Sequence, residues 1–324
     1  MKDFKGKIAV VTGGGTGMGR ELARCLVAEG CHVTICDVLV DNMEETKKLC
    51  EAEAQHGARI TICQADVASE SDLEALRAHV EKEHNTSQLH LLFNNAGVGG
   101  GGSITKPEER DSWERTFNIC WYGVYYSCRV FMPMLLASDE AHIINTSSVN
   151  GFWASIGPQT PHSAYCAAKF AVKGFSEALI TDLRLNAPHI KVSVVMPGHI
   201  GTSIAINSGK IVNGRTADEM TAEEVTALRA RLARQGMPIE NATDEQLKAL
   251  MKQMGEQFRD NAPTTAAKAS NIILDGVREE RWRILVGEDA GIMDRLVRED
   301  PENAYELSFF EKLREETNWE LGGQ

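Results

Sequence analysis

The chain has 324 residues, of which 43% are hydrophobic and 25% are charged, a composition typical of a globular protein with a large core. The formal net charge of −12 and the absence of a basic tract argue against nucleic acid or an anionic membrane surface as a main partner. No apolar run reaches the ~18 residues of a membrane span. The polar N-terminus leads directly into a strand pattern, so we expect a soluble, cytoplasmic protein without a signal peptide.

Eight cysteines occur without a C-x-x-C pair, and most of them lie inside apolar runs. This usage is typical of buried thiols in a reducing compartment and not of a disulfide framework. The nine histidines are scattered, with no H-x-x-x-H pattern and no Cys/His cluster. We therefore expect no metal site.

The first two thirds of the chain alternates short apolar runs with amphipathic patterns of helical period. Strands are predicted at residues 7–12, 31–36, 59–64, 89–93, 142–146 and 191–196. Helices are predicted at residues 17–29, 40–56, 70–84, 113–136 and 163–185. This alternation indicates an α/β fold, a doubly wound parallel sheet of the Rossmann type with helices on both faces.

The alternation stops after Pro197. Residues 203–261 contain no convincing strand, but two helix patterns at 221–235 and 243–259 each begin with a plausible threonine N-cap. A helix at 264–280, a seventh strand at 283–286 and an acidic helical tail follow. We predict a single domain over residues 1–324, with a lid inserted at about 203–262 and a C-terminal helical tail at about 289–324.

The junction of the first strand and the first helix is rich in glycine and reads Thr12-Gly13-Gly14-Gly15-Thr16-Gly17-Met18-Gly19. Glycines let the backbone turn tightly and approach a pyrophosphate, and the helix N-terminus offers free N–H groups. A glycine-rich turn alone is weak evidence, but its place at a strand-to-helix junction strongly favours a dinucleotide site.

Asp37 ends the second predicted strand, where a carboxylate can accept hydrogen bonds from the adenosine ribose and repels a 2′-phosphate. Thr16 precedes the second motif glycine, a position where a basic residue could hold that phosphate. Both residues favour NAD over NADP.

Tyr165 and Lys169 are four residues apart and so share one face of the predicted helix. Tyrosine has an ordinary pKa of ~10, so a base acting near neutral pH requires a fall of about 3, or ~4 kcal/mol. A cation ~4 Å away contributes ~1 kcal/mol in bulk water and ~4 kcal/mol at an effective dielectric constant of ~20. Lys169 can therefore activate Tyr165 if water is largely excluded.

Further motifs follow in a fixed order: Asp66-Val67, Asn94-Asn95-Ala96-Gly97, Asn118, Ser147-Ser148, Tyr165-x-x-x-Lys169 and Pro197-Gly198-x-x-x-Thr202. Together with T-G-x-x-x-G-x-G they cover residues 5–202 and resemble the short-chain dehydrogenase/reductase family in its single-domain branch. The resemblance implies hydride exchange between a secondary alcohol and NAD⁺, with a ketone as product.

In this family Ser148 is expected to bind the substrate oxygen, and Asn118 to support a water-mediated proton relay to Lys169. Ile200 and Thr202 are expected to hold the nicotinamide carboxamide. The resemblance implies this set of cofactor-binding residues: Gly13, Gly15, Thr16, Gly17, Met18, Gly19, Asp37, Asp66, Val67, Asn94, Ala96, Gly97, Tyr165, Lys169, Pro197, Gly198, Ile200 and Thr202.

The segment between Ser148 and Tyr165 is several residues longer than is usual in the family. We expect it to border the substrate pocket with Phe152, Trp153 and Ile156. The lid contributes a larger apolar set: Ile204, Ile206, Leu232, Met237, Met251, Met254 and Phe258. These bulky side chains favour an apolar aromatic or alicyclic alcohol over a small polar sugar.

Two other functions remain open on the same fold. A dinucleotide-sensing binding protein usually lacks the tyrosine or the lysine, and both are present here. An epimerase or dehydratase usually has T-G-x-x-G-x-x-G spacing and a larger C-terminal domain. Relatives commonly form homodimers or homotetramers through two long helices, which correspond here to residues 113–136 and 163–185.

Overall fold

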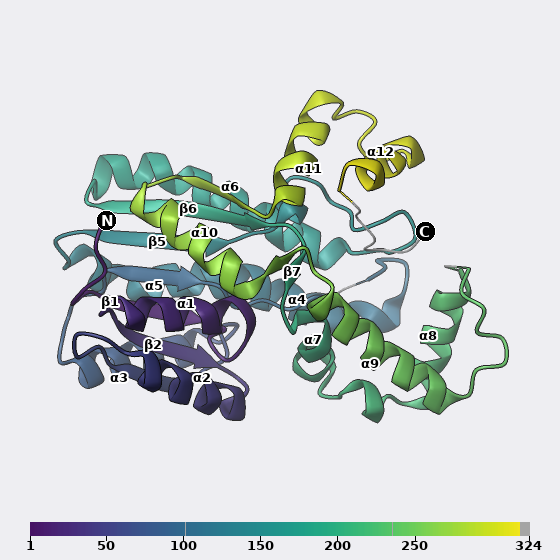
Figure 1. Cartoon of the computed structure of the whole chain (residues 1–324), viewed down its shortest axis with the longest axis horizontal. Coiled ribbons are helices and arrows are strands. Elements are labelled where there is room, and N and C mark those ends of the chain that lie inside the picture. The colour runs from purple at the N-terminus through teal and green to yellow at the C-terminus, as the bar shows by residue number, and fades with distance from the viewer. Residues whose placement is uncertain (101, 235, 318–324) are drawn as a thin grey trace.

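A computed structural model describes residues 1–100, 102–234 and 236–317, arranged around a seven-stranded parallel sheet (Figure 1). The strand order is β3-β2-β1-β4-β5-β6-β9. The strands are β1 (Ile8–Thr12), β2 (His32–Asp37), β3 (Ile60–Gln64), β4 (Leu91–Asn94), β5 (Ala141–Thr146), β6 (Ile190–Pro197) and β9 (Arg283–Val286). The order reverses between β1 and β4, and ligands of such sheets bind at the carboxyl ends of the strands near this reversal.

Helices cover both faces of the sheet, which confirms the predicted Rossmann-type fold. One face carries α1 (Gly17–Ala28), α2 (Val40–Glu53) and α10 (Ala266–Arg278). The other carries α3 (Glu70–His84), α5 (Gly123–Leu136) and α6 (Ser163–Asn186). Burial on both faces explains why the strands read as continuous apolar runs and not as alternating ones.

The helix predicted at 113–136 consists of three parts. α4 (Arg110–Phe117) leads into a π-helical turn (Asn118–Tyr122), which continues into α5. A π-helical turn holds one residue more than an α-helical turn. Residues before the turn are therefore rotated relative to those after it, which matters for the candidate active site.

The predicted lid contains three helices: α7 (Ile204–Asn213), α8 (Ala222–Arg234) and α9 (Asp244–Asp260). The sequence pattern indicated α8 and α9, and their threonine N-caps form capping boxes as predicted. It did not indicate α7, nor the two-residue pair of β7 (Ile200–Gly201) with β8 (Thr264–Thr265). α8 and α9 project away from the sheet (Figure 1).

The C-terminal tail forms α11 (Glu288–Glu299) and α12 (Leu307–Thr317), and residues 318–324 of the predicted tail lie outside the described residues. It packs on the segment that follows β5. The Trp153 indole donates to the carbonyl of Ala304 at 2.7 Å, and its ring contacts Phe309 and Phe310. The expectation that Trp153 borders the substrate pocket was therefore wrong, because the tail offers this side chain an apolar partner and a hydrogen-bond acceptor.

This packing gives a stability prediction. Trp153 has 0% of its surface exposed, so Trp153→Ala should lower the free energy of unfolding by about 3–5 kcal/mol in urea denaturation. Trp282 is 46% exposed, and Trp282→Ala serves as the matched control with an expected change within about 0.5 kcal/mol. Equal losses in the two variants would show that the tail does not anchor this segment.

Candidate active site

A cavity opens at the carboxyl ends of the central strands, where the strand order reverses. Its walls come from the glycine-rich loop, the ends of β4, β5 and β6, and helices α6, α7 and α9. The lining residues include Gly13, Thr16, Gly17, Met18, Asp37, Ala96, Gly97, Ser148, Tyr165, Lys169, Pro197, Gly198, Ile200 and Thr202. Most of the predicted cofactor-binding residues and three of the four predicted catalytic residues are thus brought together.

The glycine-rich loop is packed so closely that it excludes side chains. A Cβ at Gly19 would lie 2.1 Å from the carbonyl oxygen of Gly13, and a Cβ at Gly13 would lie 2.8 Å from Cα of Ala96. Gly13 also has a positive φ of 65°. The resulting bare backbone in front of the N-terminus of α1 is suited to a pyrophosphate.

Asp37, the last residue of β2, lies against the glycine-rich loop. Its carboxylate accepts the N–H groups of Gly15 at 3.1 Å and Leu39 at 3.0 Å. Burial raises the pKa of this carboxyl, and the two backbone N–H groups oppose that rise. A negative charge held at this point can bind ribose hydroxyls and repels a phosphate.

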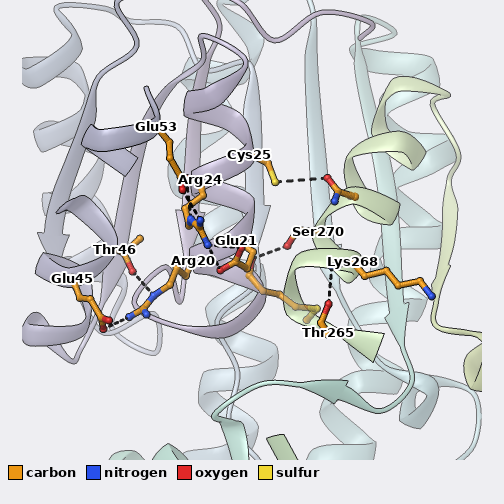
Figure 2. A network of polar contacts seen from close by, with 12 residues as sticks. Arg20, Glu21, Arg24, Cys25, Glu45, Thr46, Glu53, Thr265, Lys268 and Ser270 are labelled. Atoms are coloured by element: carbon orange, nitrogen blue, oxygen red, sulfur yellow. Dashed lines mark hydrogen bonds and ion pairs between the residues drawn. The ribbon is translucent and has the colours of Figure 1, made fainter. Parts of the chain in front are cut away.

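A polar network behind the loop holds it in place (Figure 2). The guanidinium of Arg20 donates to the carbonyl of Gly15 at 2.8 Å, to Thr46 at 3.0 Å and to Glu45 at 2.6 Å. From the neighbouring helix α10, the Ser270 hydroxyl donates to the carbonyl of Met18 at 3.2 Å. Arg20 is thereby committed to protein partners and is not available to neutralise a 2′-phosphate.

Two positioning residues were missing from the predicted set. The hydroxyl of Thr12 accepts the N–H groups of Asn95 and Ala96, each at 3.0 Å. The amide of Asn95 donates to the carbonyls of Thr12 and Gly13 at 3.0 and 3.3 Å. These bonds join the ends of β1 and β4, and the Asn-Asn-Ala-Gly motif was the sequence signal for them.

Asn94 lies one residue earlier and was expected to bind the cofactor, but its side chain connects two strands. Its buried amide donates to the Asn145 side chain at 2.8 Å, so it bridges β4 and β5 and does not line the cavity.

Asp66 and Val67 line a second, smaller cavity, which they share with Asp37 and Gly97. This arrangement suits an adenine contact at the far end of the dinucleotide.

The Lys169 side chain is 2% exposed and reaches back to the end of β5, where Nζ donates to the carbonyl of Thr146 at 2.8 Å. Nζ lies 5.4 Å from the centre of the Tyr165 ring, one helical turn earlier on α6. Burial lowers the pKa of Lys169 because the charged form is taken out of water. Water is thus largely excluded, which is the condition under which Lys169 can act strongly on Tyr165.

Burial also acts on Tyr165 itself. It raises the pKa of the phenol above its ordinary value, and a hydrogen bond with Ser148 opposes that rise. Without further positive charge the phenol therefore stays protonated near neutral pH. A phenol in this state can donate a proton, whereas accepting one requires an added cation nearby.

The two serines that follow β5 have different environments. The Ser147 hydroxyl donates to the carbonyl of Lys169 at 2.7 Å and is committed to holding α6 against the sheet. The Ser148 hydroxyl accepts the N–H of Asn150 at 3.1 Å and contacts Tyr165. Since its proton is not engaged in that backbone bond, Ser148 can donate to a ligand oxygen.

Asn118 is not brought to this group. Its side chain is exposed at the start of the π-helical turn and is absent from the described cavity linings. Two residues later, the buried thiol of Cys120 donates to the carbonyl of Val98 at 3.4 Å. A Cβ at Gly97 would lie within 4 Å of both Cys120 Sγ and Lys169 Nζ. The π-helical turn thus places Cys120, and not Asn118, next to Lys169.

Helices α7 and α9 of the predicted lid line another side of the cavity with the apolar side chains of Ile204, Ile211 and Phe258. Most of the other bulky lid residues expected at the pocket pack instead in the core between α8 and α9. These are Leu232, Met237, Met251 and Met254. The apolar wall of the cavity is therefore smaller than the sequence suggested.

A family model described as short chain dehydrogenase matches residues 7–213, which is more than half of the chain. The chain belongs to the short-chain dehydrogenase family. Among relatives in this family, SadH of Mycobacterium tuberculosis is 37% identical over 209 residues, which span 64% of this chain and 72% of SadH. A cyclohexanol dehydrogenase of Acinetobacter is 32% identical over 202 residues, spanning 62% and 76% of the two chains.

Solved structures of short-chain dehydrogenases have the same fold. A family member from Burkholderia phymatum, solved in complex with NAD, superposes with a TM-score of 0.72 at 28% identity and covers 93% of this chain and 96% of its own. A levodione reductase structure superposes with a TM-score of 0.63 at 21% identity, with 90% and 99% covered, and supports the fold alone.

The contact at Gly19 gives a prediction for dinucleotide binding. Gly19→Ala should abolish NADH binding in a fluorescence titration, because the new methyl group overlaps the Gly13 carbonyl and forces the loop open. Gly174→Ala is the matched control, since a Cβ at that helical position meets nothing within 4 Å. It should leave NADH binding unchanged and stabilise the helix slightly. Retention of NADH affinity by Gly19→Ala would contradict the proposed cofactor site.

Proposed function

We propose that this protein is an NAD(H)-dependent oxidoreductase that interconverts a secondary alcohol and a ketone. The observation that carries this proposal is the group formed by the buried Lys169 and Ser148 and the half-buried Tyr165 beside a dinucleotide-binding loop. A cation, a phenol and a hydroxyl are the parts needed to move a proton to or from an alcohol oxygen.

The residues present fit a nicotinamide dinucleotide. The bare backbone at Gly13 and Gly19 suits the pyrophosphate, the Asp37 carboxylate suits the adenosine ribose, and the second cavity suits the adenine. The bound cofactor would supply the hydride acceptor and, when oxidised, a positive ring. Asp37 and the committed guanidinium of Arg20 favour NAD over NADP, and the Burkholderia phymatum relative was solved with NAD.

Each side chain has one task in alcohol oxidation. Ser148 donates a hydrogen bond to the substrate oxygen and stabilises the charge that develops there. Tyr165 accepts the hydroxyl proton. To accept it, Tyr165 must first be a phenolate, which Lys169 stabilises by its charge; a cation ~4 Å away contributes ~4 kcal/mol at an effective dielectric constant of ~20. Because burial raises the pKa of Tyr165 above its ordinary value, Lys169 alone does not make it a base near neutral pH, and the positive ring of bound NAD⁺ would have to supply the remaining stabilisation. In ketone reduction the same proton returns from Tyr165.

The preferred substrate is an apolar alicyclic or aromatic alcohol. Ile204, Ile211 and Phe258 supply apolar side chains to the cavity lining. Asn207 and Ser208 are its polar members on α7, and none of these five residues carries a charge. The Acinetobacter relative is a cyclohexanol dehydrogenase, which is consistent with this choice. Small polyols would leave their extra hydroxyls without partners against the wall.

A dinucleotide-sensing binding protein is the alternative function. It would need the glycine-rich loop but not the buried ammonium beside a phenol. Keeping Lys169 in a water-excluded site costs free energy that simple binding does not require. This cost favours the enzyme.

We propose a cytoplasmic homo-oligomer on the basis of the free thiols and the exposed aromatic side chains. Among the described residues, no helix has both the length and the apolarity to cross a bilayer. All eight cysteines are free thiols, which is consistent with a reducing, cytoplasmic compartment. Tyr122 and Phe170 are exposed on the long helices, and such an aromatic face supports a homodimer or homotetramer.

A screen of secondary alcohols and ketones tests the proposal. Purified protein should produce NADH from cyclohexanol-like or aryl alcohols, much less from small polyols, and much less NADPH when NADP⁺ replaces NAD⁺. Tyr165→Phe should lower kcat by at least about 10²-fold, in line with loss of an acid–base group, while NADH still binds.

Two outcomes would contradict the proposal. Substantial activity in Tyr165→Phe would remove the proton-transfer role of the phenol. NADH binding by the native protein without turnover of any alcohol or ketone in a broad panel would favour the binding protein instead.

A further inference from the structure

His199 connects the lid to the body of the protein. It follows Pro197 and Gly198 at the end of β6, and its ring Nε2 lies 2.7 Å from the backbone carbonyl of Phe258 in α9. The two rings are also in contact in a tilted arrangement, with centres 4.4 Å apart and planes 40° apart. A carbonyl can only accept a hydrogen bond, so Nε2 carries the proton and donates it.

The hydrogen bond from His199 gives a donor to a carbonyl in the last turn of α9. The last four carbonyls of a helix have no partner within the helix, and Phe258 lies in the last turn of α9, which ends at Asp260. The imidazole supplies a donor from outside the helix. Burial lowers the pKa of His199, so the ring is neutral near pH 7 and needs no counter-charge to make this bond.

The other side of His199 is fixed to the body of the protein. Its backbone N–H donates to Oδ2 of Asp289 at 2.6 Å. Asp289 is 5% exposed and lies in the first turn of α11. The connection therefore runs from the C-terminal tail, through the loop after β6, to the end of the lid helix.

The Phe258 side chain lines the same cavity as Ser148 and Tyr165. The other lid helix of the cavity wall, α7, has its own attachment, in which Ser208 accepts the N–H of Gly99 at 2.8 Å. His199 thus makes a polar link between the cavity-lining end of α9 and the loop after β6.

We propose that His199 is a positioning residue that seats the Phe258 ring against the apolar part of the substrate. The inference rests on the proposed alcohol–ketone oxidoreductase function and assigns a specificity role to a residue outside the reacting group. The Nε2–carbonyl bond fixes the end of α9, and the contact with the tilted imidazole limits the orientation of the Phe258 ring.

Two substitutions at His199 separate the effect of the hydrogen bond from that of the ring contact. His199→Phe keeps a ring against Phe258 but removes the donor, whereas His199→Gln restores an amide donor. His199→Phe should raise KM for an alicyclic alcohol roughly five- to ten-fold, the effect of one net hydrogen bond. The Kd for NADH and the Tm should change little, and His199→Gln should recover most of the loss.

A double-mutant cycle with Phe258→Ala tests whether His199 acts through that ring. Once the ring is absent, adding His199→Phe should cause no further rise in KM. Fully additive effects, an unchanged KM in His199→Phe, or a matching loss of NADH affinity would each overturn the proposal.

Hydrogen exchange of the α9 amides provides a readout that does not need a substrate. In His199→Phe the last turn of α9 should exchange faster than in the native protein, and His199→Gln should restore protection. If the native protein turns over no alcohol or ketone, the proposed function fails, while this exchange experiment still decides whether His199 holds α9. Unchanged exchange in His199→Phe would refute the link.

Discussion

The candidate site depends on one buried cation. The ammonium of Lys169 is almost fully removed from water, and the described residues provide it with a carbonyl partner, Thr146, but no carboxylate within ion-pair distance. Burial lowers the pKa of Lys169 and raises that of Tyr165, so in the protein alone the phenol stays protonated near neutral pH. The same low dielectric makes any phenolate–ammonium attraction strong once it forms. The site is therefore poised to respond to an added positive charge.

The surrounding architecture keeps that arrangement fixed. The parallel sheet brings the glycine-rich loop and the end of β5 to one edge, and Ser147 ties α6 to the strand end from which Lys169 is held. The tail packs around Trp153, and helices α7 and α9 line the cavity. Each of these contacts excludes water or orients a side chain, and together they account for a site built from segments more than 200 residues apart.

The sequence predicted what depends on local chemistry. The helix at 70–84 and the strand at 283–286 have the predicted bounds, the helix because Ser69 caps its start and the left-handed Asn85 ends it. The glycine-rich loop was predictable because close backbone approach requires glycine. Features that depend on tertiary contacts could not be predicted from the sequence. The π-helical turn at Asn118 adds a residue that no propensity reveals, and the direction of Trp153 depends on a helix pair some 150 residues later. The short β7–β8 pair depends on strand neighbours that are also far apart.

The most direct test of the account is a spectroscopic titration of Tyr165. The phenolate absorbance of the native protein minus that of Tyr165→Phe, followed as the pH rises, reports the pKa of this one phenol. Without cofactor, burial should place that pKa above the ~10 of free tyrosine. With NAD⁺ bound, the positive ring and Lys169 should bring it below that value, so that the phenolate appears at lower pH. An identical transition in both states, or one that stays above the value of free tyrosine with NAD⁺ bound, would contradict the central claim.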